Sequence, residues 1–215
     1  MMNTNGSWNI KLHKSASKLK STRKCQVNLF EQLDKYTRAH SIRVQKIAQK
    51  LGENLRLTRD EINHLGTAAL FHDIGKIAVN LDILFKNKKL SAKERQQVHR
   101  HPEVGAKLWL QSGGYYRVSE GILSHHENYD GTGYPFGLAG EAIPLWGRII
   151  AIADALDAML SERPYRQPSS LDFTLKTIQQ ASGKQFDPYL ISEIHKSFKG
   201  NGFLSLYGDL WSSPS

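Results

Sequence analysis

Histidine, aspartate and lysine interrupt a stretch of the sequence that is otherwise apolar. The segment TAALFHDIGKIAV, residues 67–79, is apolar enough for a buried helix, yet it contains His72, Asp73 and Lys76. Such groups are costly to bury unless a salt bridge, a hydrogen-bond network or a metal ion compensates them. This segment is therefore the first candidate for a chemical site.

Other polar residues in the chain share this placement within apolar segments or beside one another. With the first pair they form a set of seven from five expected helical segments: His40, His72, Asp73, His101, His125, His126 and Asp154. Each alone has an ordinary structural explanation, since Asp154, for example, could pair with Arg148 or Arg163. Together they favour convergence on a cation, because several apolar segments each give up a core position to imidazole or carboxylate.

The ligand types indicate which cations would bind. Imidazole and carboxylate without thiolate suit manganese, iron, cobalt, nickel or zinc. Seven ligands exceed a four-coordinate zinc site, so the set predicts two metal ions bridged by a carboxylate and a hydroxide. Such ions lie about 3.5–4 Å apart and support in-line attack of the hydroxide at phosphorus.

Spacing along the chain limits how neighbouring residues can share an ion. On a helix His72 and Asp73 would point about 100° apart. They share one ion only near a pocket, or Asp73 bridges two ions while His72 binds on one side. His99 and His101 face different ways, so we take His101 as the ligand and leave His99 at the surface or the substrate rim.

Helices must position these residues, because apolar side chains recur three and four residues apart along most of the chain. The segments expected to be helical are residues 27–55, 57–79, 90–111, 117–127, 145–162, 169–182 and 188–198. Thr58, and Ser91 with Glu94, fit helix caps, and Asp187 with Pro188 fits a helix start. No series of strands is evident, so the fold class is all-α.

Composition and charge set the boundaries of the fold. The 215 residues suffice for one domain, predicted at residues 26–200 between a basic leader (1–25) and a tail (201–215). Six of the basic residues behind the net charge of +9 fall in the leader, which has no acidic residue. We interpret the leader as solvated and partly disordered rather than as an arm that binds phosphate or membrane, so specific nucleic-acid binding is not expected.

The cysteine count and the apolar runs bear on location. The lone Cys25 excludes an intrachain disulfide and a cysteine-based zinc site. No apolar run approaches a membrane span of roughly 18 residues, and the start of the chain does not read as a signal peptide. We therefore expect a cytoplasmic protein with no transmembrane segment.

A series of ordered motifs resembles the HD-GYP group of the HD-domain metal-dependent phosphohydrolases. They are DKYTRAHSIRV, FHDIGKIAV, LFKNKKLSAKE, HPEVG, HHENYDGTGYP, IPLWGRIIAIADALDAMLSERPYR and SGKQFDP, spread over roughly residues 33–198. The resemblance implies an HD-domain-like helical bundle. It also implies hydrolysis of cyclic di-GMP to linear pGpG, which in some members continues to GMP.

The resemblance also implies roles for individual residues. The seven residues named above match the metal ligands, and Asp73 matches the aspartate that bridges the ions. Lys76 would contact the scissile phosphate, or alternatively form a salt bridge to Asp73 or Asp154. Tyr134 of the GYP motif would contact phosphate or guanine, or simply pack the loop. Three further residues match positions that meet the guanine and the phosphates of the ligand: Asp157, Arg163 and Arg166.

The expected number of metal ions depends on one position at which this chain differs from some members of the family. Some members hold a third ion with a glutamate four residues before the first histidine, where this chain has Tyr36. We therefore expect two divalent transition-metal ions per chain, iron or manganese foremost, with nickel, cobalt and zinc as further options. This choice favours linear pGpG as the product over GMP.

Two alternatives to a cyclic di-GMP phosphodiesterase stay open. The enzyme could prefer cyclic GMP-AMP, or the chain could be a weakly active signalling protein that binds cyclic di-GMP. Since no receiver or sensor domain is recognisable, regulation through a separate protein partner is expected if the chain is regulated. The sequence leaves the oligomeric state open, with a homodimer among the options.

Overall fold

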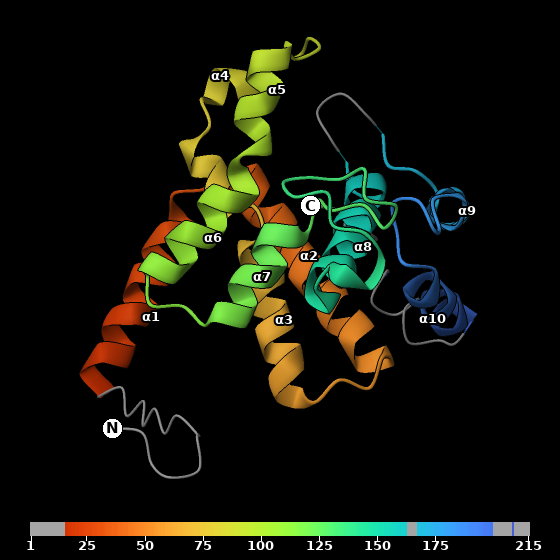
Figure 1. The fold of residues 1–215 in the computed structure, drawn as a ribbon, viewed down its shortest axis with the longest axis horizontal. Coiled ribbons are helices and arrows are strands. Elements are labelled where there is room, and N and C mark those ends of the chain that lie inside the picture. The colour runs from red at the N-terminus through yellow and green to blue at the C-terminus, as the bar shows by residue number, and fades with distance from the viewer. Residues whose placement is uncertain (1–15, 163–166, 200–207, 209–215) are drawn as a thin grey trace.

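Helices make up nearly all the regular structure in the computed structural model, which describes residues 16–162, 167–199 and 208 (Figure 1). The α-helices are α1 (Ala16–Glu31), α2 (Lys35–Asn54), α3 (Arg59–Phe71), α4 (Leu81–Leu84), α5 (Ala92–His99), α6 (His101–Gln111), α7 (Tyr116–Ser124), α8 (Leu145–Leu160), α9 (Leu171–Gln180) and α10 (Pro188–Lys199). Two short 3₁₀ helices, η1 (Ile74–Ala78) and η2 (Gly140–Ala142), accompany them. Within the described residues, extended pairing is limited to two isolated bridges, so the all-α prediction is confirmed.

The core lies among α2, α3, α7 and α8, where α3 and α8 each pack against both α2 and α7. α8 is apolar on most of its surface and buries Ile149, Ile150 and Ile152 almost completely. α6 packs against α7 and η1, while α9 lies on α8 and α10 on α2. In Figure 1, α7 lies between α6 and α8, which agrees with its packing against both. The walls around the centre therefore come from segments far apart in the sequence.

The first predicted helix is divided in two. Periodicity favoured one helix over residues 27–55, but α1 ends at Glu31 and α2 begins at Lys35. Asp34 is the N-cap of α2, and its carboxylate accepts a hydrogen bond from the Thr37 main-chain N–H at 2.9 Å. Aspartate is favoured at this position because it satisfies an N–H that lacks a helical partner. Since α1 begins at Ala16, part of the expected leader is helical.

The predicted helix caps are confirmed. Thr58 forms a capping box with Glu61 at the start of α3, and Ser91 forms one with Glu94 at the start of α5. The segment 90–111, expected as one helix, is two: α5 ends at His99 and α6 starts at His101.

The start of α10 also follows the sequence prediction. α10 begins at Pro188, and the Asp187 carboxylate accepts a hydrogen bond from the Tyr189 N–H at 2.8 Å. Arg148 on α8 forms an ion pair with the same carboxylate.

The HD dipeptide lies at a turn and not within a helix, contrary to the prediction of a helix over 57–79. α3 ends at Phe71, and His72 and Asp73 connect it to η1. Gly75 lets η1 approach α6 closely, because a Cβ on Gly75 would lie 1.9 Å from the His101 carbonyl oxygen. The main chains of the turn and of α6 are therefore in direct contact.

None of the helices in the described part of the chain combines the length and apolar character that a membrane span requires.

Candidate metal centre

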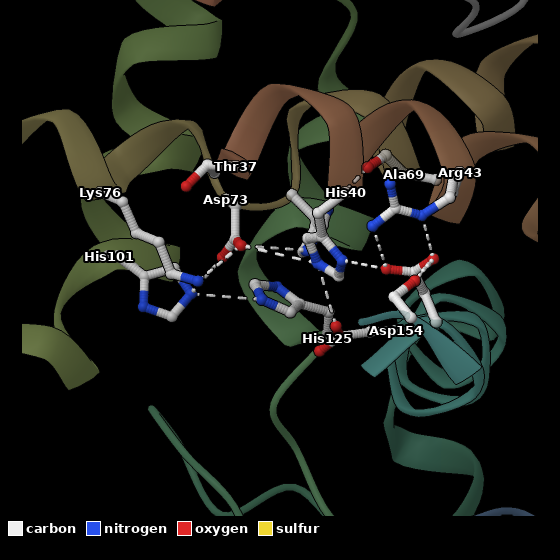
Figure 2. A network of polar contacts seen from close by, with 12 residues as sticks. Thr37, His40, Arg43, Ala69, Asp73, Lys76, His101, His125 and Asp154 are labelled. Carbon is white, nitrogen blue, oxygen red and sulfur yellow. Dashed lines mark hydrogen bonds and ion pairs between the residues drawn. The ribbon is translucent and has the colours of Figure 1, made fainter. Parts of the chain in front are cut away.

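Side chains from five parts of the helical fold converge beside the HD turn (Figure 2). α2, the turn after α3, α6, the turn after α7, and α8 contribute His40, His72, Asp73, His101, His125, His126 and Asp154. All but His126 and Asp154 are buried, and those two are partly buried. The structure thus brings together the whole predicted ligand set.

The potential ligand atoms form two groups that share one aspartate. One group consists of Asp73, His101, His125 and His126, and the other of His40, His72 and Asp73. Within each group the ligand atoms lie within 4.8 Å of one another. Asp154 adjoins the second group, because its Oδ1 lies 3.1 Å from His40 Nε2. Asp73 is therefore common to both groups of potential ligand atoms.

Three of the histidines are oriented by helix ends. Each lies one or two residues after the end of a helix, and its Nδ1 is 2.7 Å from the carbonyl oxygen three residues earlier. The pairs are His72 with Ala69, His101 with Val98 and His125 with Ile122. The last carbonyls of a helix lack helical partners, so they accept the Nδ1 proton. Each Nε2 is then left with its lone pair directed into the cluster, as in metal-binding histidines.

Buried polar atoms at the centre of the cluster lack hydrogen-bond partners. Among the described residues, His72 Nε2 and Asp73 Oδ1 are buried and unpaired. His101 Nε2 and His125 Nε2 lie 3.3 Å apart, although each presents a lone pair when its Nδ1 carries the proton. Such buried groups cost free energy when they lack partners, and cations bound within the two groups would satisfy all four atoms. The donor set therefore fits a transition-metal ion.

Protonation differs across the cluster. Burial lowers the pKa of His101 to about 3 and that of His126 to about 4, and it lowers the pKa of His125 well below the usual value. These imidazoles are neutral at pH 7, which is the form that binds metal. Burial would also lower the pKa of His40, but hydrogen bonds with Asp154 and Asp157 outweigh it and raise the pKa to about 9.

The central carboxylate is held in its charged form. Burial alone would raise the pKa of Asp73, but Lys76 and His72 outweigh it and hold the pKa well below the usual value. Lys76 Nζ lies 2.6 Å from Asp73 Oδ2, and the lysine side chain is 27% exposed. The alternative salt bridge to Asp73 is thus present, at a place where Lys76 also reaches solvent.

Tyr134 of the GYP motif covers one ligand. Its ring stacks on His126 at a centroid distance of 4.8 Å and on His99 at 3.9 Å. Burial raises the pKa of the Tyr134 hydroxyl, with Asp73 and Asp154 adding to the shift. His99 therefore lies beside the cluster without joining it, and these contacts match the packing alternative for Tyr134.

Glu127, which the sequence analysis did not single out, folds the GYP loop. Its buried carboxylate accepts hydrogen bonds from the main-chain N–H groups of Phe136 at 2.8 Å and Leu138 at 3.0 Å. At Gly133 a Cβ would lie 2.2 Å from the Asn128 nitrogen. The signal available was a carboxylate directly after two candidate ligands in HHE.

Asp157 is buried, whereas a contact with guanine was expected for it. Its carboxylate is 1% exposed and bonds to His40, Arg43 and Ser161. This placement favours a role behind His40 over the expected contact with guanine. Arg43 was missed, although it lies one helical turn after His40 in HSIRV. Arg163 and Arg166 lie outside the described residues, so their expected contacts stay predictions.

Comparisons with known proteins agree with this architecture. A model of the HD domain family matches residues 17–190. The chain is 40% identical over 166 residues to the cyclic di-GMP phosphodiesterase response regulator RpfG of Xanthomonas campestris pv. campestris (strain 8004), covering 76% of this chain and 44% of that protein. It is 34% identical over 166 residues to 3'3'-cGAMP-specific phosphodiesterase 2 of Vibrio cholerae serotype O1, covering 76% of this chain and 32% of that protein.

Among solved structures, the fold is similar to Bd1817, described as an HDG"Y"P protein from Bdellovibrio bacteriovorus. The TM-score is 0.62 at 18% identity, covering 85% of this chain and 62% of that one. This likeness confirms the predicted HD-domain-like helical fold. The chain spans less than half the length of the two curated relatives.

Proposed function

The chain belongs to the HD domain family and carries the HD-GYP motifs, and from this premise we propose that it hydrolyses a phosphodiester bond of cyclic di-GMP to give linear pGpG. One observation carries the proposal. Buried Nε2 atoms of several histidines converge on Asp73, and their other ring nitrogens are already engaged. A set of this kind has no evident structural purpose without a cation to satisfy it.

The proposed centre would hold two divalent ions, and Asp73 would serve as a ligand of both. Three residues would hold one ion: His40, His72 and Asp154. The other ion would be held by His101, His125 and His126. Two such ions supply Lewis acidity and lower the pKa of a bound water. The mixture of imidazole and carboxylate suits iron or manganese, and also cobalt, nickel or zinc.

The remaining residues position the substrate and balance its charge. Lys76 is partly exposed beside Asp73 and can donate to a non-bridging phosphate oxygen as charge develops there. Asp154 is also partly exposed, with 26% of its side chain accessible. Lys76 and Asp154, together with the partly buried His126, thus mark the edge from which a phosphodiester would reach the cluster.

The substrate class rests on similarity and not on geometry. The two curated relatives described above are named for cyclic di-GMP and for 3'3'-cGAMP. Both ligands contain the two phosphodiester bonds of a cyclic dinucleotide, and the described residues include no contact that distinguishes guanine from adenine. We choose cyclic di-GMP because the relative with the higher identity bears that name, and we retain cyclic GMP-AMP as the alternative.

Chromatography of reaction products tests the proposal. The full chain, loaded anaerobically with Mn²⁺ or Fe²⁺, is incubated separately with cyclic di-GMP and 3'3'-cGAMP, and bound metal is counted on the same sample. We expect linear pGpG from the parent chain and from the control His195→Ala, and none from His101→Ala. His195 lies on α10, outside the cluster.

Each other result has a defined meaning. Intact cyclic dinucleotides despite bound metal would contradict the proposed hydrolysis and favour a signalling protein that only binds the ligand. Faster cleavage of 3'3'-cGAMP would shift the substrate to the alternative. Accumulation of GMP would show that the inference drawn from Tyr36 was wrong.

A further inference from the structure

His40 differs from the other oriented histidines in what accepts its Nδ1 proton. It lies within α2, where the carbonyl groups of the helix already accept helical hydrogen bonds. The acceptor is instead the Asp157 carboxylate on α8, whose Oδ2 lies 2.6 Å from His40 Nδ1. The orientation of this histidine therefore depends on a side chain and not on the backbone.

Asp157 is itself fixed from several directions. Arg43 Nε donates to Asp157 Oδ1 at 2.6 Å, and Arg43 Nη2 donates to Oδ2 at 3.0 Å. Ser161 Oγ adds a hydrogen bond to Oδ1 at 2.9 Å. An isolated carboxylate this deeply buried would be strongly destabilising. The two-pronged contact from Arg43 compensates the charge and sets the plane of the carboxylate.

Two facing helices supply this arrangement through matched spacing. On α2, His40 and Arg43 are three residues apart, and on α8, Asp154 and Asp157 are also three residues apart. Side chains at this spacing share one helix face. The first residue of each pair faces the cluster, and the second lies one turn further from it. Figure 2 shows His40 between Asp73 on one side and Arg43 on the other.

We infer that Arg43 and Asp157 are positioning residues that hold His40 for one of the two metal subsites. The inference rests on the proposed two-metal centre. A carboxylate behind a metal-binding imidazole fixes its orientation and raises its basicity as a ligand. In the other subsite, His101 and His125 are oriented by carbonyl groups, which no side-chain substitution removes.

Metal titration of the full chain tests the inference. Mn²⁺ is added to the metal-free parent chain and to Asp157→Ala, Asp157→Asn and Arg43→Gln, and the number of ions and their affinities are measured. We expect two ions for the parent, with one ion weakened by about 10- to 100-fold in Asp157→Ala, the range for loss of such support. Asp157→Asn keeps an acceptor for His40 and should lose less.

A double variant separates the positioning role from a general loss of stability. If Asp157 acts through His40, then His40→Ala with Asp157→Ala should bind Mn²⁺ no more weakly than His40→Ala alone. The proton between His40 Nδ1 and Asp157 should also give a downfield NMR resonance in the metal-free parent. That resonance should be absent from both His40→Ala and Asp157→Ala.

The pair of Arg148 and Asp187 is a matched control. It joins an arginine on α8 to an aspartate that is 3% exposed, outside the two ligand groups. Arg148→Gln should lower the melting temperature, as Arg43→Gln does, but it should leave two ions bound with parental affinity. A purely structural account predicts the same metal binding for both arginine variants.

The outcomes distinguish the positioning role of Arg43 and Asp157 from the two-metal centre on which it rests. Two ions of parental affinity in Asp157→Ala would overturn the inference and leave the proposed function intact. If Asp157→Ala does not fold, Asp157→Asn and Arg43→Gln decide the question by the same criterion. A parent chain that binds no Mn²⁺ and no Fe²⁺ would overturn the two-metal centre and the positioning role together.

Discussion

The two sides of the cluster use the same type of ligand in opposite electrostatic settings. On the side of His40, two aspartates raise the pKa of the imidazole to about 9. On the side of His101 and His126, burial lowers the pKa values to about 3 and about 4. Burial acts on all three histidines, so hydrogen bonds with carboxylates determine which of them is charged at pH 7.

The two sides also differ in what holds the ligands. His101 and His125 donate to carbonyl groups near helix ends, and Tyr134 covers His126. His40 depends on an ion pair between two helices, as described above. The His40 side is therefore open to change by single side-chain substitutions, and the other side is fixed largely by the path of the main chain.

Asp73→Asn should have the largest effect, because Asp73 is the residue that both sides share. The substitution keeps the shape but replaces an anionic oxygen with an amide. We expect loss of both metal ions and of hydrolysis, measured by elemental analysis and product chromatography on one sample. Full activity with normal metal content would refute the shared role and leave two independent sides.

Lys76→Met should lower kcat by about 10²–10³-fold, the effect of removing one donor to a developing charge, while both ions stay bound. Lys50→Met is the control, since Lys50 forms a similar pair with Glu53 on the same helix at 3.0 Å. It should leave kcat unchanged. Loss of metal in Lys76→Met would show that the lysine serves the ion pair with Asp73.

The melting temperature of the metal-free chain should depend on pH in opposite ways for the two sides. For His40 the folded pKa of about 9 exceeds the ordinary 6.5, so its contribution is present below pH 6.5 and is lost as the pH rises through 9. For His101 and His126 the folded pKa values are below 6.5. Their contribution is present above pH 6.5 and is lost as the pH falls toward 4.

His40→Asn separates these two limbs of the pH profile. The variant should lose only the decline between pH 6.5 and pH 9, and the acid limb should stay as in the parent. An alkaline limb that persists in His40→Asn would contradict the assignment of the raised pKa to this residue.

Ser91→Ala should have the smallest effect. Ser91 caps α5, the helix that leads to His101, by accepting a hydrogen bond from the Glu94 N–H. Loss of such a cap costs about 1 kcal/mol of unfolding free energy, measurable by urea unfolding. Metal content should not change, because the His101 ring is oriented by Val98 and not by the cap. Loss of an ion would instead show that metal binding on the His101 side depends on the stability of α5.

The convergence of the seven polar residues and the caps could be predicted from the sequence because both leave local signals, while metal binding by these residues stays a prediction. His72 and Asp73 stand out against apolar neighbours, and Ser91 with Glu94 matches a known pattern. The break at Asp34 was missed because the apolar repeat continues across it in nearly the same phase. In the sequence, an aspartate that caps a helix looks the same as an aspartate on the surface of a continuous helix.

The support behind the ligands could not be predicted, because it depends on how two helices face each other. The spacing of Asp154 and Asp157 shows that they share a face of α8, but not that Arg43 lies opposite. Similarly, nothing in HHENYDGTGYP shows that Glu127 binds the loop rather than an ion. Such contacts join residues distant in sequence, and they follow from the packing of the core.

Gly75 makes activity sensitive to substitution at a position that contributes no side chain to the site. It has no side chain to offer a metal or a phosphate, yet even a methyl group there would meet the main chain of α6 at His101 and Gly105. In a library of all single substitutions selected for activity, position 75 should therefore tolerate as few replacements as the ligand positions themselves. The close approach of the HD turn to His101 would thus depend on the absence of a side chain at position 75.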